Sequence, residues 1–220
     1  TIKNSRVHFI IKNCTILNTG SLTFAIKMEK TSNGTLSSNF CDNDGYYGIF
    51  MSDACHNNTI TGNHMNYNTN VGIVLNQDCD HNLISGNHLH DNSYGIYLGD
   101  RCDNNSLSEN DIHDCDNNAI YLYDRCNDNT LIQNTVNDNT YGIRLEKDCY
   151  NNTISGNEAD NNLLHGIYLS DNCSKNKIWD NNATNNHYEG IWLFKYCDNN
   201  LIQGNNVINN SKNGIKLQTD

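Results

Sequence analysis

Residues 142–165 read GIRLEKDCYNNTISGNEADNNLLH, and residues 166–189 read GIYLSDNCSKNKIWDNNATNNHYE. The two segments place a Gly-Ile pair, a cysteine and three asparagines at the same offsets. Outward from them, the isoleucine of the pair recurs in steps of 23 or 24 residues at Ile26, Ile49, Ile73, Ile96, Ile120, Ile143, Ile167, Ile191 and Ile215. A repeat of this length along nearly the whole chain predicts a solenoid, in which each unit forms one turn.

Each unit contains short runs in which inward-facing residues recur at every second position, the period of a β-strand. In the second unit quoted above, these runs fall at 167–169, 176–178 and 181–183. No long stretch has the 3.6-residue period of a helix. We therefore predict an all-β parallel β-helix with three short strands per turn. About nine turns, spaced ~4.8 Å apart, give a rod roughly 43 Å long.

Asparagine supplies 44 of the 220 residues, several times its average share. Three columns of the repeat consist almost entirely of it: Asn58, Asn82, Asn105, Asn129, Asn152, Asn176 and Asn200; Asn39, Asn63, Asn87, Asn110, Asn134, Asn157, Asn181 and Asn205; and Asn68, Asn92, Asn139, Asn162, Asn186 and Asn210, with Cys115 in the missing place. An amide both donates and accepts hydrogen bonds, so stacked asparagines predict internal ladders at the corners. Asparagine also tolerates the left-handed backbone that sharp corners need.

Segments such as 151–157 (NNTISGN), followed by 166–169 (GIYL), resemble the repeat of the right-handed parallel β-helix proteins, the pectin-lyase-like solenoids. More narrowly, they are similar to the NosD-type and carbohydrate-binding and sugar-hydrolase (CASH) group. The resemblance implies a right-handed fold, as expected for parallel crossovers. It also implies an extracellular, cell-surface or periplasmic location.

The repeat meets no linker, so we expect residues 1–220 to form a single domain with an irregular first turn at about residues 1–25. An insertion between Asn18 and Ala25 is a candidate part of a cap. The chain begins at Thr1 without a leader segment, which indicates a piece excised from a longer protein. Because the open ends of a solenoid expose unpaired strand edges, we expect end-to-end self-association or further domains of the same chain.

A further column contains seven of the ten cysteines: Cys55, Cys79, Cys102, Cys126, Cys149, Cys173 and Cys197. The C-x₂-C spacing of many zinc sites is absent. Stacked cysteines lie close enough for disulfides, but side chains in register point the same way, which strains a bridge. We favour buried free thiols that fill a corner. One or more bridges are the alternative.

The net charge of −11 argues against binding to nucleic acid. No window approaches 18 consecutive apolar residues, so we expect no direct membrane span.

One residue of each Gly-Ile strand points outward between the inward isoleucine and leucine. Along the stack this position holds Lys27, Phe50, Val74, Tyr97, Tyr121, Arg144, Tyr168, Trp192 and Lys216. Exposed rings along a groove stack on sugar faces, which predicts a glycan-binding face. Its predicted residues are Phe50, Tyr97, Tyr121, Arg144, Tyr168, Trp192 and Phe194. The alternative is that the rings only stack on each other and stabilise the sheet.

Asp100, Asp124 and Arg144 are weak candidates for catalysis beside this face. The two aspartates would lie about 5 Å apart, near the separation of the carboxylates in a retaining glycosidase. The alternative is a surface lattice of ion pairs with Arg101 and Arg125. The Asp-Pro-His-Asp motif of alginate epimerases and the Asn-Thr-Asp, Gly-His-Gly and Arg-Ile-Lys motifs of polygalacturonases are absent.

Histidines provide candidate metal ligands. His64 and His88 occupy one outward position in successive turns, and His90 and His113 occupy another. Together with Asp111, they predict a patch of imidazole and carboxylate groups about 5–7 Å apart, which suits copper or zinc. NosD relatives are linked to copper delivery. The alternative is a set of solvent-exposed polar residues, and no other cofactor is expected.

These observations favour a non-catalytic, exported or cell-surface domain that binds glycan or polysaccharide along the aromatic side. The turns lack the loop excursions from which enzymes on this fold usually build their clefts. The alternatives are a structural subunit of a surface layer or filament, a NosD-like periplasmic copper-binding accessory protein, and a polysaccharide lyase, hydrolase or epimerase.

Overall fold

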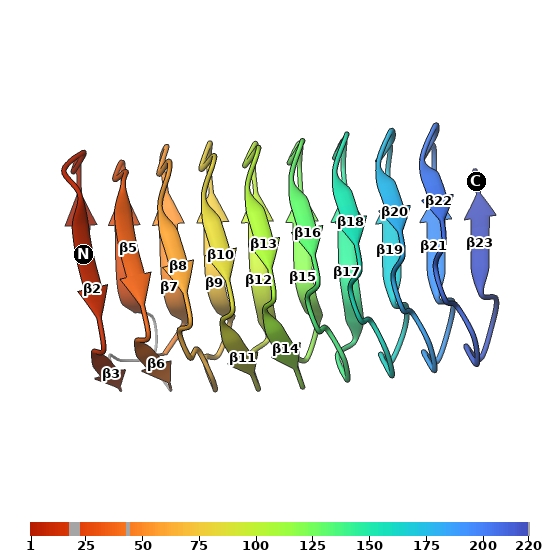
Figure 1. Ribbon diagram of the computed structural model, residues 1–220, viewed down its shortest axis with the longest axis horizontal. Helices are drawn as coiled ribbons and strands as arrows, with labels where there is room; N and C mark the ends of the chain where they lie inside the picture. The colour runs from red at the N-terminus through yellow and green to blue at the C-terminus, as the bar shows by residue number, and fades with distance from the viewer. Residues whose placement is uncertain (18–22, 43–44, 220) are drawn as a thin grey trace.

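The computed structural model of the protein describes residues 1–17, 23–42 and 45–219. The chain winds as a parallel β-solenoid, and Figure 1 shows its turns side by side from the N-terminal to the C-terminal end of a rod. The described residues form strands and turns and no helix. Accordingly, none of the described segments is a helix long and apolar enough to cross a membrane.

Two long parallel sheets form two sides of the rod. The first sheet contains β1 (Ile2–Lys3), β4 (Phe24–Glu29), β7 (Tyr47–Ser52), β9 (Val71–Asn76), β12 (Tyr94–Gly99), β15 (Asn118–Tyr123), β17 (Tyr141–Glu146), β19 (Ile167–Ser170), β21 (Ile191–Phe194) and β23 (Ile215–Gln218). The second sheet contains β2 (Phe9–Lys12), β5 (Gly34–Ser37), β8 (Thr59–Thr61), β10 (Leu83–Ser85), β13 (Ser106–Ser108), β16 (Thr130–Ile132), β18 (Thr153–Ser155), β20 (Lys177–Trp179) and β22 (Leu201–Gln203). Repeat-equivalent residues are paired, as in Ile73 with Ile96 and Ile96 with Ile120. The predicted stacking of turns is confirmed.

The third side of each turn is as short as the second and has fewer paired strands. Its paired strands among the described residues are β3 (Thr15–Leu17) with β6 (Phe40–Asp42), and β11 (His88–His90) with β14 (Asp111–His113). Later turns make only single-residue bridges there. The asparagine columns at the two ends of this side are five residues apart, as in Asn134 and Asn139, and a single buried apolar residue, Val136, fills the space between them.

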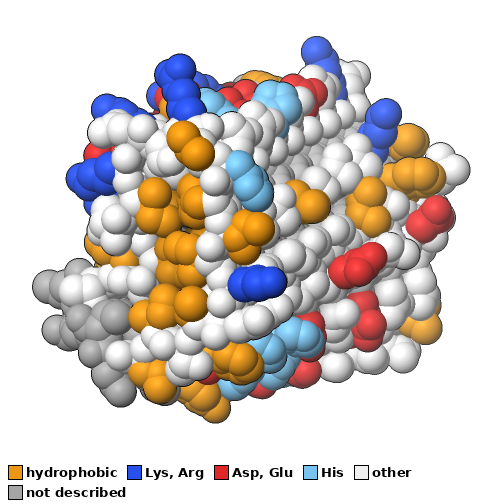
Figure 2. Space-filling model, turned by 60° about the vertical axis from the view of Figure 1, so that its left-hand side comes forward, with side chains coloured by type: hydrophobic (Ala, Val, Ile, Leu, Met, Phe, Trp, Pro, Cys, Tyr) orange, Lys and Arg blue, Asp and Glu red, His pale blue; other side chains and the backbone are white. Residues whose placement is uncertain are grey.

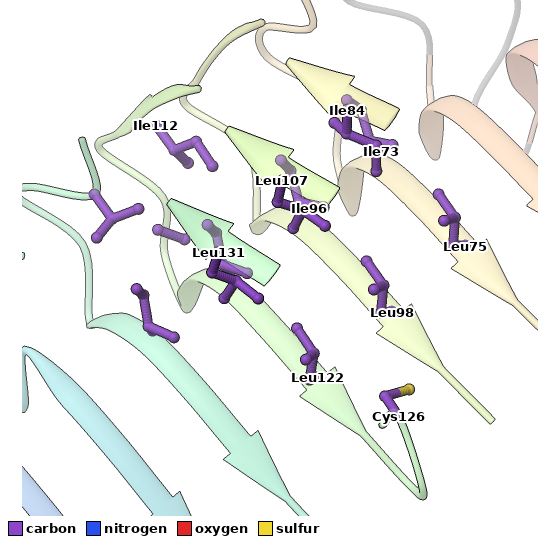
Figure 3. Close-up of a cluster of buried hydrophobic side chains, with 14 of the residues drawn as sticks. Ile73, Leu75, Ile84, Ile96, Leu98, Leu107, Ile112, Leu122, Cys126 and Leu131 are labelled. Atoms are coloured by element: carbon purple, nitrogen blue, oxygen red, sulfur yellow. The ribbon is translucent and has the colours of Figure 1, made fainter. Parts of the chain in front are cut away.

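Inward-facing aliphatic side chains form rows along the axis of the rod. In Figure 3, Ile73 and Ile96 from the first sheet approach Ile84 and Leu107 from the second. All four are 0% exposed. Burial of one such side chain stabilises the fold by roughly 1.5–3 kcal/mol. Because each turn contributes equivalent residues, the hydrophobic core extends along the whole axis of the rod and is not concentrated at one point.

Each asparagine column forms a hydrogen-bond ladder, as predicted. The Oδ1 atom of Asn110 accepts hydrogen bonds from the backbone N and the Nδ2 of Asn87 at 3.1 and 3.0 Å. The Nδ2 atom of Asn110 donates to the backbone O of Ile84 at 3.0 Å and to Oδ1 of Asn134 at 2.9 Å. This side chain is 1% exposed, so its polar atoms are satisfied inside the protein.

A second kind of ladder, at the position after the column cysteine, was not indicated by the sequence pattern. Side-chain oxygens accept the backbone N–H of the following turn: Asp80 from Asp103 at 2.8 Å, Asp103 from Asn127 at 2.7 Å, and Asn127 from Tyr150 at 2.7 Å. Here the side-chain oxygen accepts from the later turn, whereas in the asparagine columns Oδ1 accepts from the earlier turn. The side-chain oxygens of the two kinds of ladder therefore accept hydrogen bonds from opposite directions along the rod.

The left-handed corner residues are the neighbours of the column asparagines. Asn104 has φ 57° and Asp128 has φ 56°, and they precede the column residues Asn105 and Asn129. None of the described column asparagines has a positive φ. The tolerance of asparagine for the left-handed conformation is therefore used at residues such as Asn104, and not at the column positions themselves. Their side chains point inward for the ladder, so the preceding residue turns the chain.

The seven cysteines of the column are free thiols. In the cysteine column, the Sγ of Cys102 donates to the backbone O of Gly99 at 3.2 Å, and the Sγ of Cys149 donates to that of Glu146 at 3.3 Å. Burial raises the pKa of both thiols well above its ordinary value. Hydrogen bonds with neighbouring thiols instead lower the pKa of Cys79 and of Cys197. The column is therefore a row of small corner fillers, as favoured from the sequence, and not a row of bridges.

The first turn, expected to be irregular, contains β1, β2 and β3, which pair with β4, β5 and β6. The expected insertion falls largely on residues 18–22, which lie outside the described residues. Figure 2 turns this end forward and shows apolar side chains gathered on it, in keeping with the exposed Val7, Ile10 and Leu17. At the other end Ile215 and Leu217 are exposed as well, and between the two ends adjacent turns cover the equivalent apolar interior.

Cys115 breaks the third asparagine ladder, which leads to a testable prediction. Its backbone N donates to Oδ1 of Asn139 at 2.9 Å, but its buried thiol offers Asn92 no amide oxygen. Cys115→Asn restores the rung, so we expect the free energy of unfolding to rise by about 1 kcal/mol. Urea denaturation followed by circular dichroism measures this.

The control is Cys126→Asn in the apolar cysteine column, where a new amide is buried among thiols. We expect this variant to lose about 1–3 kcal/mol. If Cys115→Asn is no more stable than the wild type, the ladder does not contribute the stability that we assign to it.

Candidate functional site

The outward side chains of the first sheet form a row of rings, here called the aromatic face. The column expected from the sequence includes Phe50, Tyr97, Tyr121, Arg144, Tyr168 and Trp192, all on this sheet, and Phe194 follows at the end of β21. A second column lies three residues earlier in each turn and includes Phe24, Tyr47, Tyr94, Tyr141 and His165. All the predicted glycan-binding residues therefore lie on one face, flanked by this second column, whose Tyr47, Tyr94 and Tyr141 directly precede the Gly of their turns.

The rings of the aromatic face pack against each other. The ring centroids of Tyr97 and Tyr121 are 5.5 Å apart, and those of Tyr168 and Trp192, and of Trp192 and Phe194, are 5.0 Å apart. Tyr168 is only 8% exposed. The expectation of a fully exposed stripe is corrected: turns spaced ~4.8 Å apart bring stacked rings into contact, so each ring covers part of its neighbour.

Arg144 occupies the middle of the aromatic face. Its guanidinium carbon lies 5.1 Å from the ring centroids of Tyr121 and Tyr141 and 5.5 Å from that of Tyr168. Glu146 binds Nη2 of Arg144 and also accepts a hydrogen bond from Oη of Tyr121 at 2.8 Å. Burial, as the largest cause, raises the pKa of Tyr121. Arg144 is therefore held by rings and one carboxylate, with its positive charge largely balanced.

Two hollows interrupt the row of rings. The first, the valine hollow, has a volume of about 350 Å³ and is lined by Tyr47, Phe50, Asn70, Val71, Val74, Asn76, Tyr94, Tyr97 and Tyr121. The second, the histidine hollow, has a volume of about 580 Å³ and is lined by Tyr141, Leu164, His165, Tyr188, Glu189, Trp192, Lys212, Asn213 and Lys216. Both volumes fall in the usual range of small-ligand sites. The two hollows differ in charge, because histidine, glutamate and lysine side chains line only the histidine hollow.

His165 and Glu189 form a buried pair in the histidine hollow. The Nδ1 of His165 lies 3.2 Å from Oε2 of Glu189, and the two side chains are 5% and 6% exposed. Asn213 donates to Oε1 of Glu189 at 3.2 Å, and the Nζ of Lys216 lies 3.7 Å from the same atom. Burial lowers the pKa of His165 to about 4, although Glu189 opposes the shift. At neutral pH the imidazole is therefore uncharged.

The sequence analysis did not single out this pair as a site. His165 and Glu189 occupy the column just before the Gly of the Gly-Ile pair, where earlier turns carry Tyr47 and Tyr141. The sequence did contain a signal for this site. In a column that carries tyrosine in earlier turns, the residue changes to histidine and then to glutamate. Only the stacking of turns shows that the two side chains meet and are buried.

The weak catalytic candidates Asp100 and Asp124 are bound by arginines at an exposed corner. Arg101 binds Oδ1 of Asp100 at 2.8 Å, and Nε of Arg125 binds Oδ1 of Asp124 at 2.8 Å. The hydrogen bond from Arg125 lowers the pKa of Asp124. Arg144, the third candidate, pairs instead with Glu146. This arrangement matches the ion-pair lattice that the sequence left open as the alternative.

The four candidate metal ligands form two stacked pairs. The ring centroids of His64 and His88 are 5.0 Å apart, and those of His90 and His113 are 5.2 Å apart. His90 contacts Asp91 at 2.7 Å. Figure 2 shows histidines beside acidic side chains along one edge of the molecule. No group of three or more His, Cys, Asp or Glu within the described ranges gathers as ligands for a metal ion. Copper or zinc binding stays a prediction.

Two family models match the chain. One, described as "Right handed beta helix region", matches residues 1–157, and the other, described as "Periplasmic copper-binding protein (NosD)", matches residues 103–220. The chain is a right-handed β-helix protein of the NosD type. The family resemblance noted from the sequence is thus confirmed. A search of curated proteins found no match to this NosD-type β-helix.

Solved structures share the fold of this NosD-type β-helix. The periplasmic alginate epimerase AlgG superposes with a TM-score of 0.72 at 19% identity, over 96% of this chain and 50% of AlgG. The A-module of the mannuronan C-5 epimerase AlgE6 of Azotobacter vinelandii gives 0.69 at 12% identity, over 96% of this chain and 70% of that module. The chain thus spans about half the length of AlgG. At these identities the likeness establishes the fold alone.

The buried His165 predicts a pH dependence of stability. Its pKa is lowered from 6.5 to about 4 in the folded protein, so between these values the unfolded chain binds more protons. The free energy of unfolding therefore falls as the pH drops from about 6.5 to 4, by at most about 3 kcal/mol from this residue. Urea midpoints of wild type and His165→Gln at pH 7 and pH 4.5 measure the difference.

We expect His165→Gln to lose less stability on acidification than the wild type does. Other titrating groups are common to both proteins, so the comparison isolates the imidazole. Equal losses would show that His165 is protonated as readily in the folded state as in the unfolded state.

Proposed function

We propose that this protein binds a polysaccharide chain along the aromatic face. The observation that carries the proposal is the row of rings along the first sheet. Two hollows lie within this row, on the same side of the rod. The C–H faces of sugars pack on aromatic rings, and hydroxyl groups bond to neighbouring amide and phenol groups. The ~4.8 Å spacing of the turns is close to the length that one sugar adds to an extended chain, so successive sugars meet equivalent positions.

The relatives support this proposal. AlgG and the AlgE6 A-module are epimerases of alginate and mannuronan by name, so this fold occurs in other proteins that act on polysaccharides. NosD is described as a periplasmic protein, and AlgG is a periplasmic epimerase. We therefore propose an exported location, in the periplasm or beyond it, where polysaccharides are accessible.

The test uses two tryptophans on different sides of the rod. Trp192 lies on the aromatic face, where its centroid is 5.0 Å from that of Tyr168, whereas Trp179 lies in β20 of the second sheet and is 41% exposed. We expect Trp192→Ala to weaken binding of hexose or uronate oligosaccharides about ten-fold, equivalent to about 1.4 kcal/mol. Addition of Tyr121→Ala should weaken it further. Isothermal titration measures both effects.

Trp179→Ala is the matched control, and we expect its affinity to equal that of the wild type. Thermal unfolding of all variants separates lost binding from lost structure. The proposal fails if the wild type binds none of the polymers, or if folded Trp192→Ala binds as tightly as the wild type.

A second candidate function is acid–base chemistry on a bound polysaccharide, favoured by the His165–Glu189 pair. At neutral pH the uncharged imidazole can act as a general base, a weak one because its pKa is lowered to about 4, and the backbone N–H of Glu189 orients it through Nδ1 at 3.3 Å. Arg144 and Lys216 are close enough to influence the charge of His165, and they would stabilise negative charge that develops on a substrate. This candidate concerns a lyase, epimerase or hydrolase.

Incubation with hexose and uronate polymers tests the second candidate, with new reducing ends, unsaturated products and epimerised sugars as readouts. We expect turnover in the wild type and a loss of at least a hundred-fold in His165→Gln. His8→Gln, an exposed histidine near the start of the chain, is the control and should keep full activity. Absence of any product with the wild type would eliminate catalysis by this segment on these polymers.

A further inference from the structure

The two stacks of rings on the aromatic face are both interrupted in the same turn. In strand β9, Val71 pairs with Tyr47 on one side and Tyr94 on the other. In the same strand, Val74 pairs with Phe50 and Tyr97. Both outward columns thus change from rings to valine in a single turn and return to rings in the next. This double change forms the floor of the valine hollow.

The rings on both sides of the valines belong to stacks that continue away from the gap. Tyr47 stacks on Phe24 with a centroid distance of 5.3 Å and an interplanar angle of 8°. Tyr94 stacks on Tyr121 with a centroid distance of 6.3 Å and an angle of 16°. Since each of these rings uses its outer face in its own stack, its other face is directed toward the turn that carries the valines.

The size of the gap corresponds to one missing ring. The flanking strands β7 and β12 are two turns apart, or about 9–10 Å. A ring inserted midway would therefore lie about 5 Å from each tyrosine ring, close to the 5.3 Å between the stacked rings of Phe24 and Tyr47. Val71 and Val74 are 5% and 3% exposed, so the surrounding side chains already cover most of this apolar floor. The hollow above them has a volume of about 350 Å³.

The chemistry of the valine hollow favours an uncharged ligand. Its lining consists of tyrosine, phenylalanine, valine and asparagine, without an acidic or basic side chain. Asn70, whose Nδ2 lies 3.4 Å from Oη of Tyr47, and Asn76 provide amide donors and acceptors for hydroxyl groups. A carboxylate placed here would lose hydration without gaining a cation, which is costly.

We propose that the valine hollow binds one neutral pyranose ring, which completes the stack between Tyr47 and Tyr94. The inference rests on the proposed function and deepens it by naming the position and the class of one sugar. Charged sugars are left to the histidine hollow, where Lys212 and Lys216 line the surface. The ligand predicted for the whole face is therefore a polysaccharide that contains neutral hexose units.

Val71→Tyr tests the proposal because it supplies the missing ring from the protein itself. In a parallel sheet, a tyrosine between Tyr47 and Tyr94 extends the existing stack, so the melting temperature should stay equal to that of the wild type or rise. Affinity for neutral gluco- and manno-oligosaccharides, measured by isothermal titration, should fall at least ten-fold. Val71→Thr has nearly the shape of valine, leaves the gap open and should keep the affinity within about three-fold, even where its buried hydroxyl lowers stability.

The outcomes separate this inference from the proposed function. Undiminished binding by folded Val71→Tyr overturns the inference and leaves binding by the aromatic face intact. No binding of any oligosaccharide by the wild type overturns both. Wild-type binding of oligo-uronates alone, abolished in Val71→Tyr, overturns the assignment of a neutral sugar while it locates the ligand in the valine hollow.

Methyl NMR of the wild type gives a readout that does not depend on how the variant folds. Titration with a neutral oligosaccharide should shift the methyl signals of Val71 and Val74, because both lie under the proposed ring. The methyl signal of Val136, buried on the third side of the solenoid, serves as the internal control and should not move. Shifts confined to residues outside the valine hollow would overturn the proposal.

Discussion

The hydrogen bond from one asparagine to its equivalent in the next turn is the interaction on which the rest of the structure depends. Asn87, Asn110 and Asn134 are almost completely buried, and each Oδ1 in this row accepts both the side-chain and the backbone N–H of the turn before it. A shift of one residue would leave these groups buried and unpaired, at roughly 1–3 kcal/mol each. The ladders therefore impose a single register, and the register in turn determines which side chains touch on every side of the rod.

Strict register also explains why the surface is organised in columns. The spacing that stacks Ile73 on Ile96 inside the rod also stacks His64 on His88 and Tyr168 on Trp192 outside it. A ring that repeats in every turn is thus covered by its neighbours, and stacking alone accounts for much of the aromatic face. On the aromatic face, hollows with room for a ligand lie where a column of rings changes to another residue type, as it does at Val71 and at His165.

Several particular predictions depended only on spacing, and these agree with the structure. Cys102 and Asn105 lie buried in their columns, and Tyr121 and Trp192 lie on the same outward face. The predictions that needed local geometry were less accurate. The left-handed residue is Asn104 and not Asn105, and the degree of burial of Tyr168 depends on the rotamers of rings in adjacent turns. A periodic sequence specifies neighbours along the axis, but it does not specify how far one side chain covers another.

By itself, the sequence determined the class of fold, the number of residues per turn and the identity of the stacked columns, because a repeat of 23 or 24 residues brings equivalent side chains to the same place in every turn. The tertiary structure alone decided which outward residues are buried, that Asp100 and Asp124 are occupied by arginines, and that His165 and Glu189 meet in a hollow. Arg101 and Arg125 directly follow the aspartates that they bind, and His165 and Glu189 are equivalent residues of successive turns. The period of the repeat brings such residues close together, but their burial and the geometry of their contacts depend on side-chain packing across the surface.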